Sequence, residues 1–160
     1  MRLLVPVDGS AASHRAVEHA VWLAQGRAGA GIVLLNVQNR DTLGLSEIDA
    51  DAGNEVAIAA EHSEKVLHAA AMVCEKAGLS FETRAEFGPV GETILRVAHE
   101  CHADQIIMGS RGLGRVRAML LGSVATEVIQ AAGIPVTVVK RGTRLPGHGA
   151  AESTDGSPAG

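Results

Sequence analysis

The sequence predicts an α/β fold in which one open parallel sheet is covered by helices on both faces. Short continuous apolar runs alternate along the chain with longer runs of helical periodicity, which is typical of strands joined by crossover helices. Most of the apolar runs have no polar face, as expected of strands that are buried on both sides. With 160 residues, of which 46% are hydrophobic, the chain is long enough to form one domain around its own core.

The first half of the chain contains two predicted strands with a helix between them. Residues 3–7 form an apolar run that ends at Asp-Gly-Ser, and residues 32–37 form a second one. Between these runs, Ser10 is a suitable N-cap for a helix with apolar residues at helical spacing, and two glycines supply the stop signal. The weakly periodic residues 38–53 then predict a surface loop.

The middle of the chain continues this alternation. Residues 54–76 are rich in alanine and other good helix formers, and Gly78 ends the predicted helix. Residues 80–87 alternate between polar and apolar, so they predict a strand with one polar face, which belongs near an edge of the sheet. A helical stripe over residues 90–102 is followed by the apolar run 105–108, the fourth predicted strand.

A final helix and strand follow a glycine-rich connection. Ser123 opens the predicted helix, and Gly133 caps its end. Residues 134–139 then form the last predicted strand, with Pro135 near its start.

The N-terminal end of the chain predicts no signal peptide, and the C-terminal end predicts no strand or helix. The N-terminal apolar run is cut off by Asp8 and is too short for a signal peptide, so we expect a soluble, cytoplasmic protein with no membrane partner. Residues 141–160 have almost no large apolar side chain and are rich in Gly, Pro, Ser and Ala. They predict a disordered tail after a domain of residues 1–140.

Charge and composition exclude some classes of partner. The formal net charge is −4, and Trp22, Phe81 and Phe87 are the only aromatic residues. A nucleic-acid-binding domain usually presents a basic face and aromatic rings for base stacking, so we expect no nucleic-acid partner. Cys74 and Cys101 lie in predicted helices, which favours inert thiols in a reduced compartment.

The connection between the fourth predicted strand and the last helix is the most informative segment. Its spacing is Gly109-x2-Gly112-x9-Gly122-Ser123, with Ser123 at the start of the helix. Unpaired amides at a helix N-terminus form an anion site, and glycines allow a phosphate to approach the main chain. The other interpretation is a flexible loop followed by a cap, which for an isolated pair of glycines is the better one.

Two common phosphate-binding motifs do not fit this segment. No Gly-Lys-Ser or Gly-Lys-Thr ends it, which excludes a P-loop. The partial G-x-G of Gly112 and Gly114 lacks the third glycine of a dinucleotide fingerprint, because Arg117 stands there.

At this point the chain resembles the universal stress protein family over roughly residues 2–140. Three matches occur in the family's order: VPVDGS after the first strand, ADQIIMGSRG at the fourth, and the G-x2-G-x9-G-S spacing before IPVTVV. The last match is the pattern of the family's ATP-binding branch. The resemblance implies an open, Rossmann-like sheet of five parallel strands in the order 3-2-1-4-5.

The resemblance also implies a binding site for ATP, alone or with Mg²⁺. The nucleoside would lie at the ends of the first two strands, with adenine touching the main chain of Val37 or its neighbour Asn36. The phosphates would lie on the glycine loop. The implied binding residues are Pro6, Val7, Asp8, Asn36, Val37, Gly109, Gly112, Gly122, Ser123 and Val124.

Several of these residues also have simpler interpretations. The Asp8 carboxylate would accept from the nucleoside, yet it could equally accept from a turn amide of Ser10 or Ala11, and both roles can coexist. The motif does not fix Arg111 or the other two arginines of the loop. We include Arg111 as a candidate phosphate ligand, although solvated loop arginines are about as good an interpretation.

His99 and His102 form the remaining candidate site. They share a helix face at i, i+3 spacing and could begin a metal site, but the sequence places no third ligand beside them. We interpret them as histidines in the last turn of a helix, where the helix dipole favours positive charge.

The function that the sequence favours is an ATP-binding stress-response regulator that senses or signals nucleotide state as a dimer. No base is placed to activate water, so we predict no catalytic residue and leave open slow ATP hydrolysis. The last strand, with Val136, Val138 and Val139, would form a homodimer at the sheet edge, and a further protein partner is expected but unidentified. The alternatives are a nucleotide-independent interaction module of the same fold and a nucleotide-using transferase.

Overall fold

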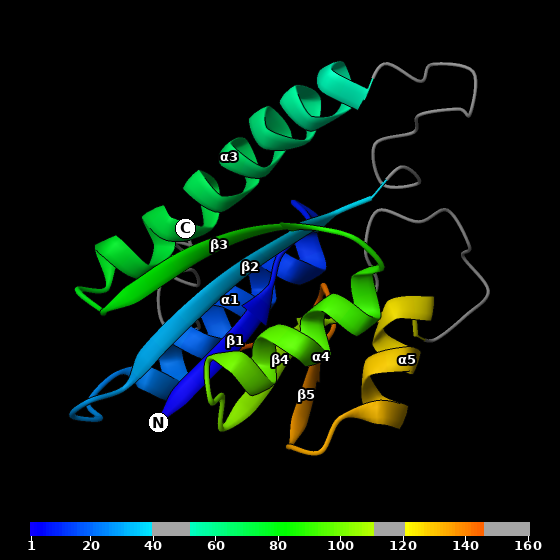
Figure 1. The fold of residues 1–160 in the computed structure, drawn as a ribbon. Helices are drawn as coiled ribbons and strands as arrows, with labels where there is room; N and C mark the ends of the chain where they lie inside the picture. The colour runs from blue at the N-terminus through cyan, green and yellow to red at the C-terminus, as the bar shows by residue number, and fades with distance from the viewer. Residues whose placement is uncertain (40–51, 111–120, 146–160) are drawn as a thin grey trace, which may run out of the picture.

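The predicted sheet is present in the structure, a computed structural model that describes residues 1–39, 52–110 and 121–145. Five parallel strands have the order β3-β2-β1-β4-β5, as the resemblance implied (Figure 1). The elements along the described chain are β1 (Arg2–Pro6), α1 (Ala11–Ala24), β2 (Gly31–Gln38), α3 (Ala52–Lys76), β3 (Phe81–Phe87), α4 (Val90–Glu100), β4 (Gln105–Gly109), α5 (Ser123–Ala131) and β5 (Val136–Val139).

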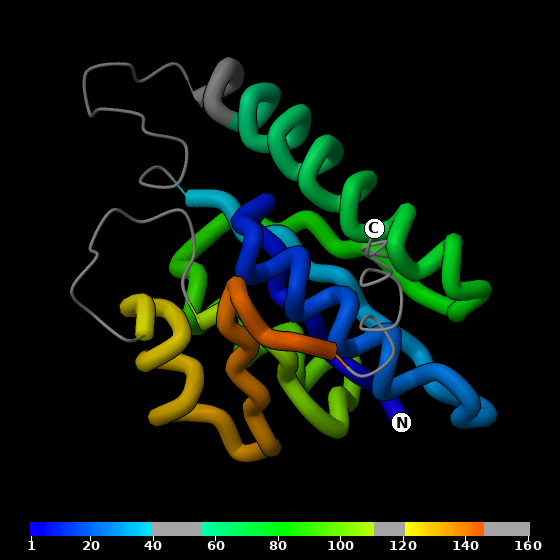
Figure 2. Tube along the Cα trace, turned by 180° about the vertical axis from the view of Figure 1, so that it is seen from behind, coloured from blue at the N-terminus to red at the C-terminus, as the bar shows by residue number. Residues whose placement is uncertain are grey.

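Helices cover the sheet on both faces. Helices α1 and α3 lie on one face, and α4 and α5 lie on the other (Figures 1 and 2). Alternate side chains of a strand point to opposite faces, so each strand contributes to two apolar clusters. In β2, Ile32 and Leu34 pack toward α1 and α3, whereas Val33 and Leu35 pack toward α4 and α5. The predicted pattern of strands buried on both sides is therefore confirmed.

Helix α1 begins where the sequence predicts. The Ser10 side chain caps it by accepting a hydrogen bond from the Ser13 amide at 3.1 Å. Helix α3 ends at Lys76, and the following Gly78 has a φ of +66°, a left-handed conformation that favours glycine. Only its start differs from the prediction, since the helix begins two residues earlier, at Ala52.

Three predicted boundaries in the second half are wrong by one or two residues. Helix α4 ends at Glu100, because His102 adopts a left-handed φ of +50° and Ala103 donates back to the Ala98 carbonyl at 2.9 Å. Ser123 is the first residue of α5, as predicted, but the C-cap of this helix is Ala132 and not the predicted Gly133.

The last of these boundaries is the start of β5. The strand begins at Val136 instead of residue 134. Proline has no amide hydrogen, and Pro135 joins the ladder only through its carbonyl, which accepts from the Ile106 amide at 3.0 Å.

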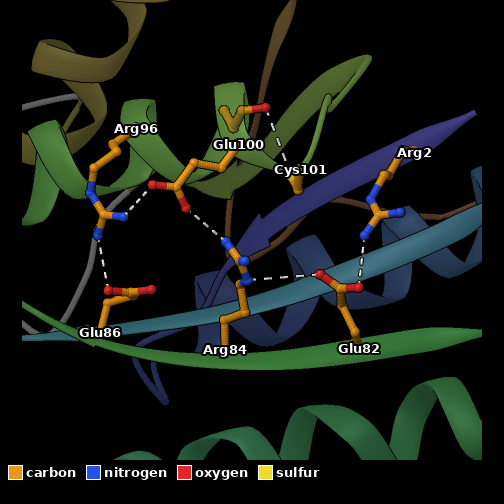
Figure 3. Close-up of polar contacts among 8 residues, drawn as sticks. Arg2, Glu82, Arg84, Glu86, Arg96, Glu100 and Cys101 are labelled. Atoms are coloured by element: carbon orange, nitrogen blue, oxygen red, sulfur yellow. Dashed lines mark hydrogen bonds and ion pairs between the residues drawn. The ribbon is translucent and has the colours of Figure 1, made fainter.

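Strand β3 lies at one edge of the sheet, as its polar face predicts. Figure 3 shows a chain of ion pairs over this edge, which joins β3 to β1 and α4. Arg84 reaches Glu82 at 3.9 Å and Glu100 at 3.0 Å. The remaining pairs join Arg2 to Glu82, Arg96 to Glu86, and Arg96 to Glu100.

Both cysteines are buried and carry free thiols. Burial raises the pKa of the Cys74 thiol to about 11, so the reactive thiolate is scarce at neutral pH. This agrees with the prediction of inert thiols.

Beyond β5, the described chain runs to Leu145, on the side of the sheet that carries α1 (Figure 2). Leu145 is only 6% exposed, although it falls within the predicted tail. The rest of that tail, residues 146–160, and most of the predicted loop 38–53 lie outside the described residues. Among the helices of the described ranges, none has the length and apolar character needed to cross a membrane.

The ion pairs at β3 predict a pH-dependent stability. Hydrogen bonds from Arg96 lower the pKa of Glu100 below its ordinary value of 4.5, with a smaller contribution from Arg84. A lowered folded-state pKa means that the stabilisation is complete above pH 4.5 and is lost as the pH falls through the lowered value. Urea unfolding of Glu100→Gln should therefore have a lower midpoint than that of the native protein at pH 7, and the two midpoints should converge below pH 4.5. A difference that persists in acid would assign the effect to packing.

Candidate functional site

The predicted site residues that the structure describes gather at one edge of the sheet. The carboxyl ends of parallel strands lie at the same end of a sheet. The strand order changes direction between β1 and β4, because β2 and β3 lie on one side of β1 and β4 and β5 lie on the other. Ligands of open α/β sheets bind at such a switch point. Residues from the ends of β1, β2 and β4 and from the start of α5 meet here. Arg111 and Gly112 lie outside the described residues.

The segment after β1 holds Asp8 in a tight turn. One carboxylate oxygen, Oδ1, accepts from the Ser10 amide at 2.9 Å, which confirms the predicted turn role. The Asp8 amide lies 3.4 Å from the Ser13 hydroxyl oxygen. Asp8 is half-buried, and its second oxygen has no hydrogen-bond partner among the residues that the structure describes. Within the described part of the chain, that oxygen is therefore a free acceptor.

The end of β2 presents an open stretch of main chain. Pro6 pairs with Leu35, and the Val7 amide donates to the Leu35 carbonyl at 2.8 Å. The next rung of a regular parallel ladder would join the Val37 amide to the Val7 carbonyl, but within the described chain this bond is not formed. The amide and carbonyl of one strand residue point to the same side, so both Val37 groups face the place where β1 has ended.

A buried polar cluster, which the sequence analysis missed, underlies this open stretch. Asn36, Gln38 and Ser63 are 1%, 3% and 3% exposed. The Asn36 amide nitrogen donates to the Val7 carbonyl at 2.7 Å. Its oxygen accepts from the Gln38 side chain at 2.7 Å and from the Ser63 hydroxyl, on α3, at 2.8 Å. The signal was available, because Asn36 and Gln38 are two polar residues on the same face of an otherwise apolar strand.

Gly109, at the end of β4, has a packing role. A Cβ atom at this position would lie 2.8 Å from the Ser13 amide nitrogen and 2.9 Å from the Ala12 carbonyl carbon. Both are main-chain atoms of the first turn of α1, so neither can move aside easily. The close approach of α1 to β4 therefore requires glycine here, whether or not a ligand is bound.

The N-terminus of α5 completes the edge. The Gly122 amide donates to the Ser110 carbonyl at 2.8 Å, and the Ser110 amide donates to the Val139 carbonyl at 2.8 Å, which ties the helix start to β4 and β5. Gly122 has a φ of −72° and a ψ of 162°, an extended conformation open to any residue, and it provides no side-chain cap. The first-turn amides, including those of Ser123 and Val124, have no intrahelical partner and form an anion site.

His99 and His102 lie at the opposite edge of the sheet. They line a half-open hollow of about 380 Å³ together with apolar residues of α4, β4 and the segment before β5. His99 is in the last turn of α4, as predicted, whereas His102 lies beyond the end of the helix, contrary to the prediction. Among the described residues, no group of three or more His, Cys, Asp or Glu side chains is arranged to hold a metal ion.

Comparisons with known proteins agree on one family. The family model described as "Universal stress protein family" matches residues 1–140. A universal stress protein homologue of Staphylococcus aureus strain USA300 is 33% identical over 141 residues, which cover 86% of this chain and 82% of the relative.

Solved structures give the same result. The protein MJ0577, a test case of structural genomics, is 27% identical with a TM-score of 0.73, and the match covers 89% of this chain and 97% of that one. A universal stress protein solved in complex with cAMP is 25% identical with a TM-score of 0.60, and the match covers 88% and 97% of the two chains.

Replacing Gly109 tests its packing role. Gly109→Ala forces a methyl group against the first turn of α1 and should lower the free energy of unfolding by about 1–3 kcal/mol. Urea denaturation measures this change. Gly31→Ala is the matched control, because a Cβ atom at Gly31 meets nothing within 4 Å. Equal stability of the two variants would show that β4 and α1 have room for the methyl group.

Proposed function

This chain belongs to the universal stress protein family, and on that basis we propose that it is a cytoplasmic ATP-binding regulator of a stress response. It would sense or signal the state of the nucleotide pool as a homodimer. Any hydrolysis of ATP would be slow, because the groups described at the edge of the sheet are binding groups.

The observation that carries this proposal is the open main chain of Val37 beside the end of β1. The amide and the carbonyl of Val37 match the edge of adenine, which has a hydrogen-bond acceptor at N1 next to a donor at the 6-amino group. The free Asp8 oxygen is a suitable acceptor for a ribose hydroxyl. Pro6 and Val7 would border the nucleoside between these two groups.

The phosphates would bind at the start of α5. Its unpaired first-turn amides and dipole favour an anion, and the Ser123 hydroxyl is an exposed donor beside them. In the proposed complex, Gly109, Arg111 and Gly112 would also contact the phosphates. Mg²⁺, where present, would arrive with the triphosphate.

The related structure with cAMP supports an adenine nucleotide as the ligand class. The number of phosphates on the ligand of this chain is to be determined by experiment. We favour ATP because the G-x2-G-x9-G-S spacing, the pattern of the family's ATP-binding branch, is complete in this chain.

We also propose that the dimer forms through β5. The edge strands differ in charge: β3 carries Glu82, Arg84 and Glu86, whereas β5 has the sequence VTVV. Val136 and Val138 are half-buried and uncharged. An uncharged edge strand with free main-chain groups favours pairing with its two-fold mate.

Nucleotide binding can be tested by calorimetry and thermal shift with ATP, AMP, cAMP and GTP. ATP should bind and raise the melting temperature, since a ligand selective for the folded state stabilises it. GTP should bind more weakly, because guanine has the reverse order of donor and acceptor. Absence of both heat and thermal shift at millimolar ATP would contradict the proposal and favour a nucleotide-independent interaction module.

Two glycines that flank α5 allow loss of binding to be separated from loss of folding. Gly122→Val should abolish ATP binding, because its branched side chain occupies the space of the phosphates, while the extended backbone accepts valine. Gly133→Val makes the same change at the other end of α5, where a Cβ atom meets nothing within 4 Å, and should bind ATP normally. Normal binding by Gly122→Val would mean that the phosphates lie elsewhere.

The dimer is tested by light scattering behind a sizing column. The native protein should have the mass of a dimer at tens of micromolar, and Val138→Asp should shift it toward monomer by burying an unpaired charge. Thr83→Asp, an exposed site on the other edge strand, is the control and should leave the mass unchanged. A monomeric native protein, or a dimer unaffected by Val138→Asp, would rule out assembly through β5.

A further inference from the structure

The Asn36 amide has only one orientation that satisfies its neighbours. Its oxygen accepts two hydrogen bonds, from Gln38 and from Ser63, which uses both lone pairs. Its nitrogen must therefore be the atom that faces the Val7 carbonyl, at 2.7 Å. At 1% exposure, water cannot replace these partners. The side chain is fixed by contacts with three different segments: the end of β1, the end of β2 and helix α3.

The contact with Val7 has a consequence for Val37. Buried carbonyl groups are almost always hydrogen-bonded, and Val7 is only 5% exposed. The Val7 amide donates to the Leu35 carbonyl. In a regular parallel ladder, the Val7 carbonyl would then accept from the next amide of β2 that faces β1, which is that of Val37. The Asn36 side chain supplies the donor in place of Val37. Among the described residues, the Val37 amide is thereby left without a hydrogen-bond partner at the edge of the sheet.

We infer that Asn36 is a positioning residue, which holds the Val7 carbonyl out of the ladder and so keeps the Val37 amide free to read the base. Ser63 and Gln38 keep Asn36 in the required orientation, so α3 takes part in base recognition without touching the nucleotide. This inference rests on the proposed function for its ligand, but its structural step concerns the protein alone.

The structural step can be tested by NMR on the native protein without nucleotide. Scalar coupling across hydrogen bonds should connect the Asn36 side-chain nitrogen to the Val7 carbonyl carbon, and no coupling should connect the Val37 amide to that carbon. In Asn36→Leu the Val7 carbonyl loses its donor, and the Val37 amide should take its place. A Val37-to-Val7 coupling in the native protein would overturn the inference, whatever nucleotide the protein binds.

The recognition step can be tested by comparing ATP with inosine triphosphate. Inosine has a donor at N1 and an acceptor at position 6, so the native protein should prefer ATP by on the order of tenfold to a hundredfold. In Asn36→Leu the Val37 amide is occupied, and the preference should fall to near unity. A merely structural role would weaken the binding of both nucleotides equally and leave their ratio unchanged.

Two further variants keep this test decisive. Asn36→Ser retains a polar side chain but is too short to reach the Val7 carbonyl, so it should reproduce the loss of preference if the leucine variant fails to fold. Thr93→Val changes a residue of similar burial on the opposite face of the sheet and should keep the native ratio. An unchanged ratio in both Asn36 variants overturns the inference, whereas a native protein that binds neither nucleotide contradicts the proposed function instead.

Discussion

Burial of the sheet on both faces is the constraint on which the rest of the molecule depends. Leu3, Leu4 and Val5 are fully buried in consecutive positions of β1, and each such side chain contributes about 1.5–3 kcal/mol. Strands of this kind have little room for polar chemistry along their length. Polar groups therefore gather where the strands end, and the free oxygen of Asp8 and the open main chain of Val37 lie at the same edge for this reason.

Much of the fold could be predicted because its signals are local. Short apolar runs predicted the strands, and the longer runs of helical periodicity between them predicted the helices. Ser10 marked the start of a helix, and the polar face of residues 80–87 placed that strand at an edge of the sheet. The errors arose where local signals mislead. His102 adopts a left-handed conformation that glycine usually takes, so the sequence has no mark at the end of α4. The contact of Ser63 with Asn36 joins residues 27 positions apart, and no motif connects them.

The glycines of one motif have different physical roles that spacing cannot separate. Gly109 is required by the main chain of α1, which would lie within 3 Å of a Cβ atom at this position. Gly122 has an ordinary extended backbone, so its missing side chain is not demanded by conformation. A sequence pattern treats both as phosphate-binding positions. The structure shows a packing demand at the first, and at the second the backbone conformation makes no demand for glycine.

The charged edge at β3 bears on how far this sheet can grow. A parallel sheet that added copies end to end would join β5 of one molecule to β3 of the next, and repetition of that contact would give a filament. Such a contact would displace or bury the ion pairs of Glu82, Arg84 and Glu86, which extend to β1 and α4. The two edges are therefore not complementary to each other. The proposed association through β5 would close after two copies, and the charged edge at β3 would oppose open-ended polymerisation.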